Sequence, residues 1–599
     1  MDYASCRSLP AMFFERAQAR GERPFLWAKR DGAYRPLSWA AAADTVRRLA
    51  RGLIALGIEP GDRVVLVSEN RPEWVVADLA VVAAGAATVP AYVTNTVDDH
   101  RHIFGNSGAR AVIVSSPALA ARALAAAAQV PSVRHVITID PLPEAPSAVP
   151  VKGWDEALAI GAAEPDDLAG RIAALKPDDM AALMYTSGTG GVPKGVVLSH
   201  RNILANCRGA YRLLEMLGLD DEVFLSFLPL SHSYEHTAGM YFPISIGAEI
   251  YFAEGADTLA HNLGEVRPTI MTAVPRLYET MHQRISRQVE RERGLKRALF
   301  EKAVAIGRKR LVDQPLSIGE RVIDPLLEKL VRGKVRARFG GRLKAMISGG
   351  APLNPEIGSF FLGLGVRLLQ GYGQTEAAPV IACNPPPQVR IDTVGPALDG
   401  VEIRIAEDGE ILVRGDNVMK GYWNDPEATA RTLADGWLHT GDIGRLDSDG
   451  YLRITDRKRD FIKNSGGDMI SPARIEGELT LAPEIAQAMV VGDRRPYLAA
   501  VVVPDPDWAA QYAAARGVAC ELTKLSTDAL FHKAVAEAVA RINEALPHNE
   551  RVRRFVIAEE AFSVANGQMT PTLKIKRHAV RDAYGAALDS LYEGKGIAA

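Results

Sequence analysis

The chain has 599 residues, of which 47% are hydrophobic and 24% charged, and its formal net charge at pH 7 is -2. This length exceeds what one hydrophobic core supports, so roughly three or four domains or subdomains are expected. The near-neutral charge excludes a protein that binds nucleic acid as a whole, because neutralising phosphates requires a clear basic excess. The four cysteines lie far apart without metal-ligand spacing, which indicates reduced thiols in the cytoplasm.

The N-terminal part of the sequence shows neither a secretory signal nor a membrane span. Its opening residues lack a basic region followed by a long apolar stretch. The most apolar long segment, residues 75–90, is interrupted by Asp78 and is too short to cross a bilayer. It predicts a buried helix that runs into a turn, and we expect a soluble protein.

Up to about residue 390, helical and strand-like patterns alternate. Residues 41–58 have helical spacing, with Gly57 where the helix is expected to end. Short valine-rich runs predict strands that are buried on both faces. Such alternation indicates α/β subdomains in which helices cover parallel sheets. The predicted strands lie at 63–68, 109–116, 224–230, 248–253 and 344–350.

After about residue 390 the pattern becomes β-rich. Residues 401–415 contain two alternating strands around an Asp-Gly turn, and residues 447–457 repeat that pattern. From residue 460 onward, short strands mix with helices, as in a separate α+β domain. We therefore predict an N-terminal region (1–455) that ends in a β-rich subdomain (about 391–455), a hinge (456–459) and a C-terminal domain (460–599).

Residues 284–342 differ in charge from the rest of the chain. They contain 17 Lys and Arg against 7 Asp and Glu, a local excess of +10. One interpretation is a set of solvated helix faces. The other is a surface for anionic lipid headgroups, since each basic residue near such a surface contributes about 1 kcal/mol. The second interpretation predicts peripheral contact with the inner face of the membrane.

Residues 185–195, YTSGTGGVPKG, form a polar, glycine-rich loop. Its glycines leave backbone N–H groups exposed, and its Ser and Thr residues add hydroxyls. Both suit phosphate oxygens, and Lys194 adds a positive charge. A nucleotide-binding P-loop would end in Gly-Lys-Ser/Thr, whereas this loop has a proline before the lysine and a glycine after it. The P-loop interpretation therefore fails, and the remaining alternatives are another phosphate-binding loop or a surface turn without a ligand.

This loop resembles the signature loop of the adenylate-forming, acyl-activating superfamily, and the other motifs of that superfamily follow in order over nearly the whole chain. Seven ordered motifs are far more specific than any one of them. Within the superfamily the sequence is most similar to AMP-dependent long-chain acyl-CoA synthetases. The further motifs are LPLSHSYEHTAG (228–239), SGGAPL (348–353), QGYGQTE (370–376), GWLHTGDIG (436–444), DRKRDFIKNSGGDMISPARIE (456–476) and TPTLKIKR (570–577).

The resemblance implies a reaction in two steps. A fatty acid, of long or medium chain length, attacks the α-phosphorus of ATP to give acyl-AMP and pyrophosphate, and the thiol of CoA then displaces AMP. The glycine-rich loop would hold the β- and γ-phosphates, where neutralising charge favours departure of pyrophosphate. Mg²⁺ would be bound mainly through ATP, with Glu376 and Thr186 as the associated protein residues.

The resemblance also assigns roles to individual positions. His232 would lie near the substrate carboxylate, Lys574 would reach that carboxylate and the α-phosphate, and Lys463 would face the thioester site after the C-terminal domain has rotated about Arg459. Gly466 and Gly467 would line the CoA channel. The nucleotide-binding positions would be Thr186, Ser187, Gly188, Thr189, Gly190, Gly191, Lys194, Gly350, Ala351, Tyr372, Gly373, Thr375, Asp442 and Arg457.

Three positions depart from the family pattern. Gly190 stands where the family usually has a second threonine, Asp468 stands where long-chain members often carry a lysine, and Gln374 lies at a position that varies freely and carries no inference. The pivot Arg459 stands where the family usually has Asp or Lys. None of these changes removes a catalytic position. The alternatives left open are a ligase that passes the acyl group to a carrier-protein thiol, a ligase for an aromatic or alicyclic acid, and a non-catalytic ligand-binding or membrane-scaffold protein. His232 and Tyr372 could also be purely structural.

Overall fold

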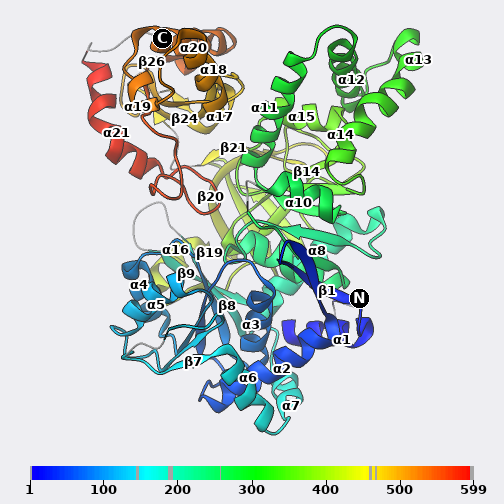
Figure 1. The fold of residues 1–599 in the computed structure, drawn as a ribbon, viewed down its shortest axis with the longest axis vertical. Coiled ribbons are helices and arrows are strands. Elements are labelled where there is room, and N and C mark those ends of the chain that lie inside the picture. Colours follow the sequence, from blue (N-terminus) through cyan, green and yellow to red (C-terminus); the bar gives the residue numbers. More distant parts are fainter. Residues whose placement is uncertain are drawn as a thin grey trace.

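The structure is a computed structural model that describes residues 3, 5–143, 147–186, 193–255, 258–457, 462–465 and 468–593, with only the backbone of residues 456 and 457. Figure 1 shows one α/β layer at the bottom, a second at the right, a β-rich part between them and the C-terminal domain at the upper left. Among the described residues, no helix is long and apolar enough to cross a membrane.

The first sheet has eight strands and carries the glycine-rich loop at one end. Its strands from β8 to β7 are parallel, while β9 and β18 extend it in antiparallel fashion. In order across the sheet these are β18 (Gly421–Tyr422), β9 (Lys194–Ser199), β8 (Met180–Thr186), β4 (Ala87–Ala91), β3 (Arg63–Val67), β5 (Ala111–Val114), β6 (His135–Thr138) and β7 (Val151–Gly153). The helices of this part are α2 (Trp39–Ala55), α3 (Pro72–Ala83), α4 (Val97–Ser107), α5 (Pro117–Ala127), α6 (Trp154–Ala163) and α7 (Leu168–Ala174).

The second sheet also has eight strands and is parallel except at its two edges. Its order is β15 (Val380–Cys383), β14 (Leu368–Gly373), β13 (Ala345–Ser348), β12 (Ile270–Ala273), β10 (Val223–Ser226), β11 (Glu249–Phe252), β1 (Pro24–Arg30) and β2 (Ala33–Ser38). Its helical elements are α1 (Leu9–Arg20), α8 (His200–Leu214), η1 (Glu215–Leu217), η2 (Glu235–Tyr241), α9 (Phe242–Ile246), α10 (Leu259–Val266), α11 (Pro275–Arg291), α12 (Leu295–Leu311), α13 (Ile318–Leu327), η3 (Glu328–Arg332), α14 (Gly333–Arg338), α15 (Pro355–Gly363) and η4 (Thr375–Ala377).

The two remaining parts are smaller. A five-stranded sheet contains β16 (Val401–Ile405), β17 (Glu410–Gly415), β20 (Trp437–Leu446), β19 (Leu433–Ala434) and β21 (Leu452–Arg457), with α16 (Pro426–Thr432) beside it. The C-terminal domain contains the hairpin β22 (Ile462–Lys463) and β23 (Met469–Ile470), the sheet β24 (Ile485–Val491), β25 (Leu498–Pro504) and β26 (Val552–Ile557), and the helices α17 (Pro472–Leu479), α18 (Pro506–Arg516), α19 (Leu522–Leu525), α20 (Ala529–Ala545), η5 (His548–Glu550) and α21 (Arg577–Tyr592).

One hydrophobic core joins the two large sheets, and α3 lies inside it. This helix is apolar on all sides, and every residue after Glu73 is buried. The predicted helix within residues 75–90 is therefore confirmed, and its interruption at Asp78 is explained because this buried carboxylate accepts hydrogen bonds from His236 and Tyr241.

The predicted α/β fold is confirmed, and the expected strands are present. The strand expected at 224–230 ends at Ser226, and Pro229 follows, which has no N–H for a sheet. Residues 401–415 form the expected hairpin of β16 and β17. β21 ends at Arg457 and the next described strand is β22, while residues 458–461, including the predicted pivot Arg459, lie outside the described residues, so the hinge stays a prediction.

The C-terminal domain is docked on α11 through polar contacts. Arg276 donates to the Ala486 carbonyl at 2.6 Å, and Gln283 donates to carbonyls of the same segment. Arg287 forms ion pairs with Asp505 and, at 2.7 Å, with Asp507. These contacts place residues 480–486 and 505–507 of the C-terminal domain against α11.

Candidate active site

The glycine-rich loop connects β8 to β9, and its two ends are in register. Thr186, the last residue of β8, pairs with Lys194, the first residue of β9. The Lys194 ammonium lies 3.4 Å from an Asp425 oxygen and 5.2 Å from the centre of the Tyr422 ring. The other predicted loop residues, Ser187, Gly188, Thr189, Gly190 and Gly191, lie outside the described residues.

Glu376 lies beside the same tyrosine. The Tyr422 hydroxyl donates to Glu376 Oε1 at 2.8 Å, and β18, which carries Tyr422, pairs with β9. Tyr422 thus links the predicted metal residue Glu376 to the predicted phosphate residue Lys194. Sequence reasoning missed Tyr422 and Asp425, although both belong to the motif GDNVMKGYWNDPEAT at 415–429.

Tyr372 and Asp442 come from different sheets and meet at the site. The Tyr372 hydroxyl donates to Asp442 Oδ2 at 2.5 Å, and both side chains are buried. The ring packs in the hydrophobic cluster of the β-rich part, so Tyr372 is also a core aromatic residue. Gly373 is required by its surroundings, since a Cβ there would lie 2.0 Å from the Pro379 carbonyl oxygen.

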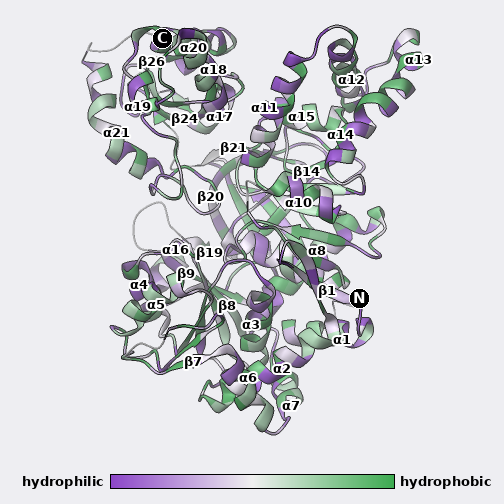
Figure 2. Cartoon of the chain, in the orientation of Figure 1, coloured by the Kyte–Doolittle hydropathy of each residue, from purple (hydrophilic) through white to green (hydrophobic). Residues whose placement is uncertain are grey.

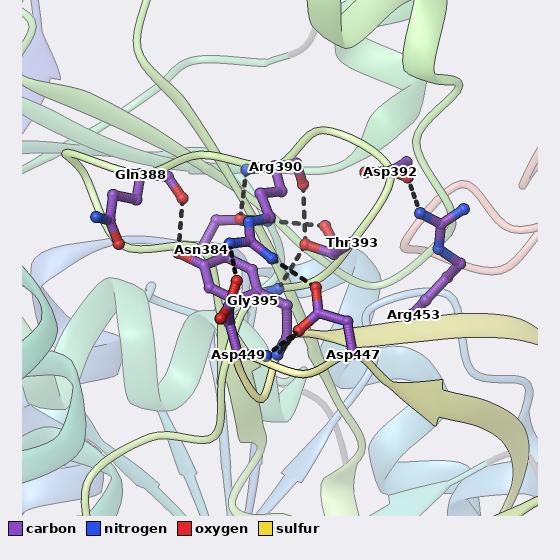
Figure 3. A network of polar contacts seen from close by, with 10 residues as sticks. Asn384, Gln388, Arg390, Asp392, Thr393, Gly395, Asp447, Asp449 and Arg453 are labelled. Atoms are coloured by element: carbon purple, nitrogen blue, oxygen red, sulfur yellow. Dashed lines mark hydrogen bonds and ion pairs between the residues drawn. The ribbon is translucent and has the colours of Figure 1, made fainter. Parts of the chain in front are cut away.

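A polar network holds the β-rich sheet, and with it Asp442, against the second large sheet (Figure 3). Arg390 forms ion pairs with Asp447, at 2.6 Å, and Asp449 in the turn between β20 and β21. Arg453 of β21 pairs with Asp392. Asp442 on β20 and Arg457 on β21 are paired in register. This network therefore fixes the position of the backbone at both residues.

His232 lies in the segment after β10. Its Nδ1 accepts a hydrogen bond from the Tyr234 N–H at 3.2 Å. Burial, followed by the charge of Lys574, lowers the pKa of His232 to about 3, so the imidazole is neutral at pH 7. Thr375 of η4 lies beside this segment, and its hydroxyl is 2.9 Å from the hydroxyl of Ser233.

Lys574 is carried on a tight turn of the C-terminal domain. Thr570 and Lys574 exchange hydrogen bonds, and Leu573 between them has a φ of 61°. A Cβ built on Gly350, whose φ is 85°, would lie 3.9 Å from Lys574 Cε. The docked domain therefore brings Lys574 next to Gly350 and close enough to His232 for its charge to affect the pKa of that histidine. The exposed Ala351 follows Gly350 directly in the chain.

Glu235 is a buried carboxyl that sequence reasoning did not select. It accepts hydrogen bonds from Ser226 on β10 and Thr272 on β12, both at 2.6 Å. Burial raises its pKa to about 7. Its carboxyl fills the space over Gly239, where a Cβ would lie 2.4 Å from it. The signal in the sequence was a glutamate inside the motif LPLSHSYEHTAG, three residues after His232.

The residues expected at the thioester site are not gathered with the others. Lys463 is exposed on β22, where its N–H donates to Asp493 at 3.2 Å. Gly466 and Gly467 lie outside the described residues, and of Arg457 only the backbone is described. The roles of these positions stay predictions.

A divalent cation fits this site only as a partner of bound phosphates. Among the described residues there is no group of three or more His, Cys, Asp or Glu side chains that could hold a metal ion. Glu376 offers one carboxylate, and one of its oxygens already accepts from Tyr422. Such a donor set suits a Mg²⁺ ion that keeps waters and takes most ligands from a nucleotide.

A cavity of about 840 Å³ among the described residues lies elsewhere. It is bounded by α11, α12, α15 and residues 389–392, and none of the predicted site residues lines it. Its cations Arg308 and Arg390 already form ion pairs, with Glu356 and with Asp447 and Asp449.

Comparison with solved structures identifies the fold. The A domain of carboxylic acid reductase from Segniliparus rugosus, in complex with AMP and a co-purified carboxylic acid, superimposes with a TM-score of 0.77 at 23% identity, over 98% of this chain and 94% of that one. A benzoate CoA ligase from Burkholderia xenovorans matches with a TM-score of 0.71 at 24% identity, over 96% and 100%. The fold is that of the adenylate-forming enzymes.

Sequence comparison identifies the family. The family description "AMP-binding enzyme" matches residues 13–423, and "AMP-binding enzyme C-terminal domain" matches residues 459–596. The long-chain-fatty-acid–CoA ligase FadD15 of Mycobacterium tuberculosis is 33% identical over 98% of this chain and 97% of its own length. The human long-chain-fatty-acid–CoA ligase 6 is 31% identical over 98% and 87%. The chain belongs to the family of AMP-binding enzymes.

Proposed function

We propose that this protein activates fatty acids of long or medium chain length to acyl-CoA, with ATP as the energy source and AMP and pyrophosphate as by-products. The observation that carries this proposal is the approach of Lys574 to Gly350 and His232, where a cation is held at the junction of the two domains. The long-chain fatty acid is proposed because relatives with that substrate in their names match nearly the whole chain.

In the first step, Lys574 would offset the repulsion between the two anions that react, the fatty-acid carboxylate and the α-phosphate. Preorganised charge of this kind acts most strongly in a site that excludes water. His232 is neutral at neutral pH, so it would orient the carboxylate by a hydrogen bond without competing with Lys574 for the negative charge.

The remaining polar residues would hold the nucleotide. Asp442 would accept hydrogen bonds from the ribose hydroxyls, and Tyr372 orients that carboxylate by donating to it. Lys194, with the loop residues before it, would neutralise the departing pyrophosphate. A Mg²⁺ ion bound through the phosphates, with Glu376 and Thr186 beside it, would supply further positive charge.

The second step would need a different surface of the C-terminal domain. Lys463 is exposed on β22 in the arrangement described here, while Lys574 is at the site. Rotation at the predicted hinge 456–459 would exchange the two and admit the thiol of CoA past Gly466 and Gly467. The cytoplasmic location and contact of residues 284–342 with a membrane are further parts of this proposal.

The test is a panel of acids from C2 to about C20, with benzoate, assayed for pyrophosphate release and for acyl-CoA formation. We expect both products, with the largest kcat/KM for long or medium aliphatic chains. Pyrophosphate without acyl-CoA would point to a carrier-protein acceptor, and preference for benzoate would point to an aromatic substrate. No pyrophosphate with any acid would contradict the proposal.

A further inference from the structure

Helix α13 buries two carboxylates and exposes a row of apolar side chains, although Leu327 is buried and Ile323 packs against the core. Its carboxylates Glu320 and Asp324 are buried, whereas Ile318, Val322 and Leu326 are 82%, 76% and 49% exposed. These three side chains follow one another at intervals of four residues, which places them on one face of the helix. Leu330, 38% exposed, extends the row into η3. We call these four side chains the α13 stripe.

The reason that these carboxylates are buried lies in α12 and η3. Glu320 accepts from Lys309 at 2.8 Å and from Lys302 at 3.3 Å. Asp324 pairs with Arg310 and, at 2.8 Å, with Arg332. Carboxylates buried next to cations must keep their partners, because an unpaired buried charge is costly. Rotating α13 to bury its stripe would separate these pairs, so the apolar side chains stay outside.

Exposed apolar side chains are concentrated in this part of the molecule. Of the eleven large hydrophobic side chains that are largely exposed among the described residues, six lie between residues 295 and 330. Figure 1 shows α13 at the outer edge of the molecule, and hydrophobic and hydrophilic residues alternate along it in Figure 2. Exposed apolar side chains that share one helix face are typical of a site of interaction.

The charge around the stripe is positive. Arg321, Lys329 and Lys334 are exposed, and none of them forms an ion pair with another described residue. The acidic side chains of α13 and η3 are engaged by cations, since Glu320 pairs with Lys309, Asp324 with Arg310 and Glu328 with Arg336. The excess of basic residues predicted for 284–342 therefore reaches the surface beside an apolar stripe.

We propose that α13 is the element by which this protein docks on an anionic lipid bilayer, with the α13 stripe inserted among the acyl chains and Arg321, Lys329 and Lys334 at the headgroups. A bilayer is chosen because it offers both an apolar interior and negative charge, as an amphipathic interfacial helix requires. The choice also rests on the proposed function, since a long-chain fatty acid partitions into membranes.

This proposal differs from the purely electrostatic contact expected from the sequence. Arg308, Lys309 and Arg310, the most basic run of the region, are all engaged by carboxylates of Glu356, Glu320 and Asp324. They hold α12 to its neighbours, so the binding surface is instead α13, with apolar contacts and cations together.

The experiment measures co-sedimentation with vesicles of phosphatidylcholine containing about 30% phosphatidylglycerol, for the full chain without substrate. The test variant replaces Ile318, Val322 and Leu326 by serine, and a second variant carries Arg321→Glu and Lys329→Glu. The control variant is Leu530→Ser with Lys533→Glu on α20, where Leu530 is 64% exposed and Lys533 is also exposed.

We expect wild type and control to bind these vesicles at 0.1 M salt. The serine variant should bind at least tenfold more weakly at any salt. The glutamate variant should lose about fivefold or more per cation at 0.1 M salt and much less at 1 M, where the Debye length is about 3 Å. Circular dichroism and melting temperature check that each variant is folded.

Three outcomes would overturn the proposal: wild type that ignores anionic vesicles, a serine variant that binds as wild type does, or a wild type that is dimeric without lipid and becomes monomeric in the serine variant. The last would assign the stripe to a second copy of the chain. Acyl-CoA formation from detergent-dispersed acid is measured separately, so an inactive enzyme that still binds vesicles contradicts the proposed function and not the docking.

Discussion

The two halves of the candidate site are built in different ways. The half that carries His232 belongs to a core: Glu235 is buried between two strands, and Tyr234 donates to the Ile347 carbonyl. The half that carries Lys574 is a turn on a domain that reaches the site through polar contacts on α11. These contacts are polar, whereas the His232 half is packed into the protein interior. The difference indicates that one half is fixed and that the other can be replaced.

The largest effect is expected from Lys574→Ala. We expect adenylation, measured as acid-dependent pyrophosphate release, to fall about 100–1000-fold, because a positioned charge is lost only from the first step. The same variant supplied with synthetic acyl-AMP should form acyl-CoA at a rate near wild type. Lys576→Ala, in the same segment, is the matched control. Equal loss in both half-reactions would show that the two halves do not separate.

Asp442→Ala tests the fixed half, which both steps would use. Loss of a charged hydrogen-bond partner costs about 1.5–3 kcal/mol, so AMP and ATP should both bind roughly ten- to a hundredfold more weakly. Isothermal titration with AMP measures this directly. The expected loss in both half-reactions contrasts with Lys574→Ala. Unchanged AMP affinity would refute the ribose assignment.

Glu235→Gln tests whether the fixed half depends on a buried, protonated carboxyl. Burial raises the pKa of Glu235 from its usual 4.5 to about 7, so the folded protein keeps a proton that the unfolded chain loses. The stabilisation is complete below pH 4.5 and is lost as the pH rises through 7. Wild type should therefore lose about 2 kcal/mol of unfolding free energy between pH 5 and pH 7 relative to the variant.

Urea unfolding at several pH values, with wild type and variant side by side, gives this difference. His232 contributes a slope of the opposite sign, because its depressed pKa favours the folded protein as the pH rises from about 3 to 6.5. This slope is common to both proteins and cancels in the comparison. If the free energy of unfolding changes with pH in the same way for wild type and variant, Glu235 is ionised in the folded protein at pH 7.

The smallest effect is expected at the docking surface. Arg287→Ala removes two ion pairs, while Asp505 keeps its hydrogen bonds to the first turn of α18. The Asp507 pair is exposed and contributes little. The Asp505 carboxylate is buried but stays hydrogen-bonded, so we expect a total loss of about 0.5–1 kcal/mol, seen as a roughly two- to fivefold slower adenylation with no slowing of the step from acyl-AMP. Arg284→Ala, exposed on the same helix, is the control. Slowing of both steps would argue against a replaceable half.

The sequence predicted the local parts of this protein well. Continuous valine-rich runs located β3 and β5, and two alternating strands around an Asp-Gly turn located the hairpin of β16 and β17. The motifs identified the superfamily and its candidate site residues. Their spacing could not show that Tyr422 joins Glu376 to Lys194, because that contact depends on how β18 pairs with β9.

What the sequence determined by itself was therefore which residues form helices and strands and which motifs they carry, since these depend on neighbours within a few positions. Only the tertiary structure decided that Tyr372 meets Asp442 across 70 residues, and that Lys574 lies at Gly350. It also decided which face of α13 is buried. The apolar residues of Ile318–Leu327 would be expected inside, but the cations of α12 and η3 hold Glu320 and Asp324 there. Leu327 is still buried, whereas Ile318, Val322 and Leu326 are left exposed.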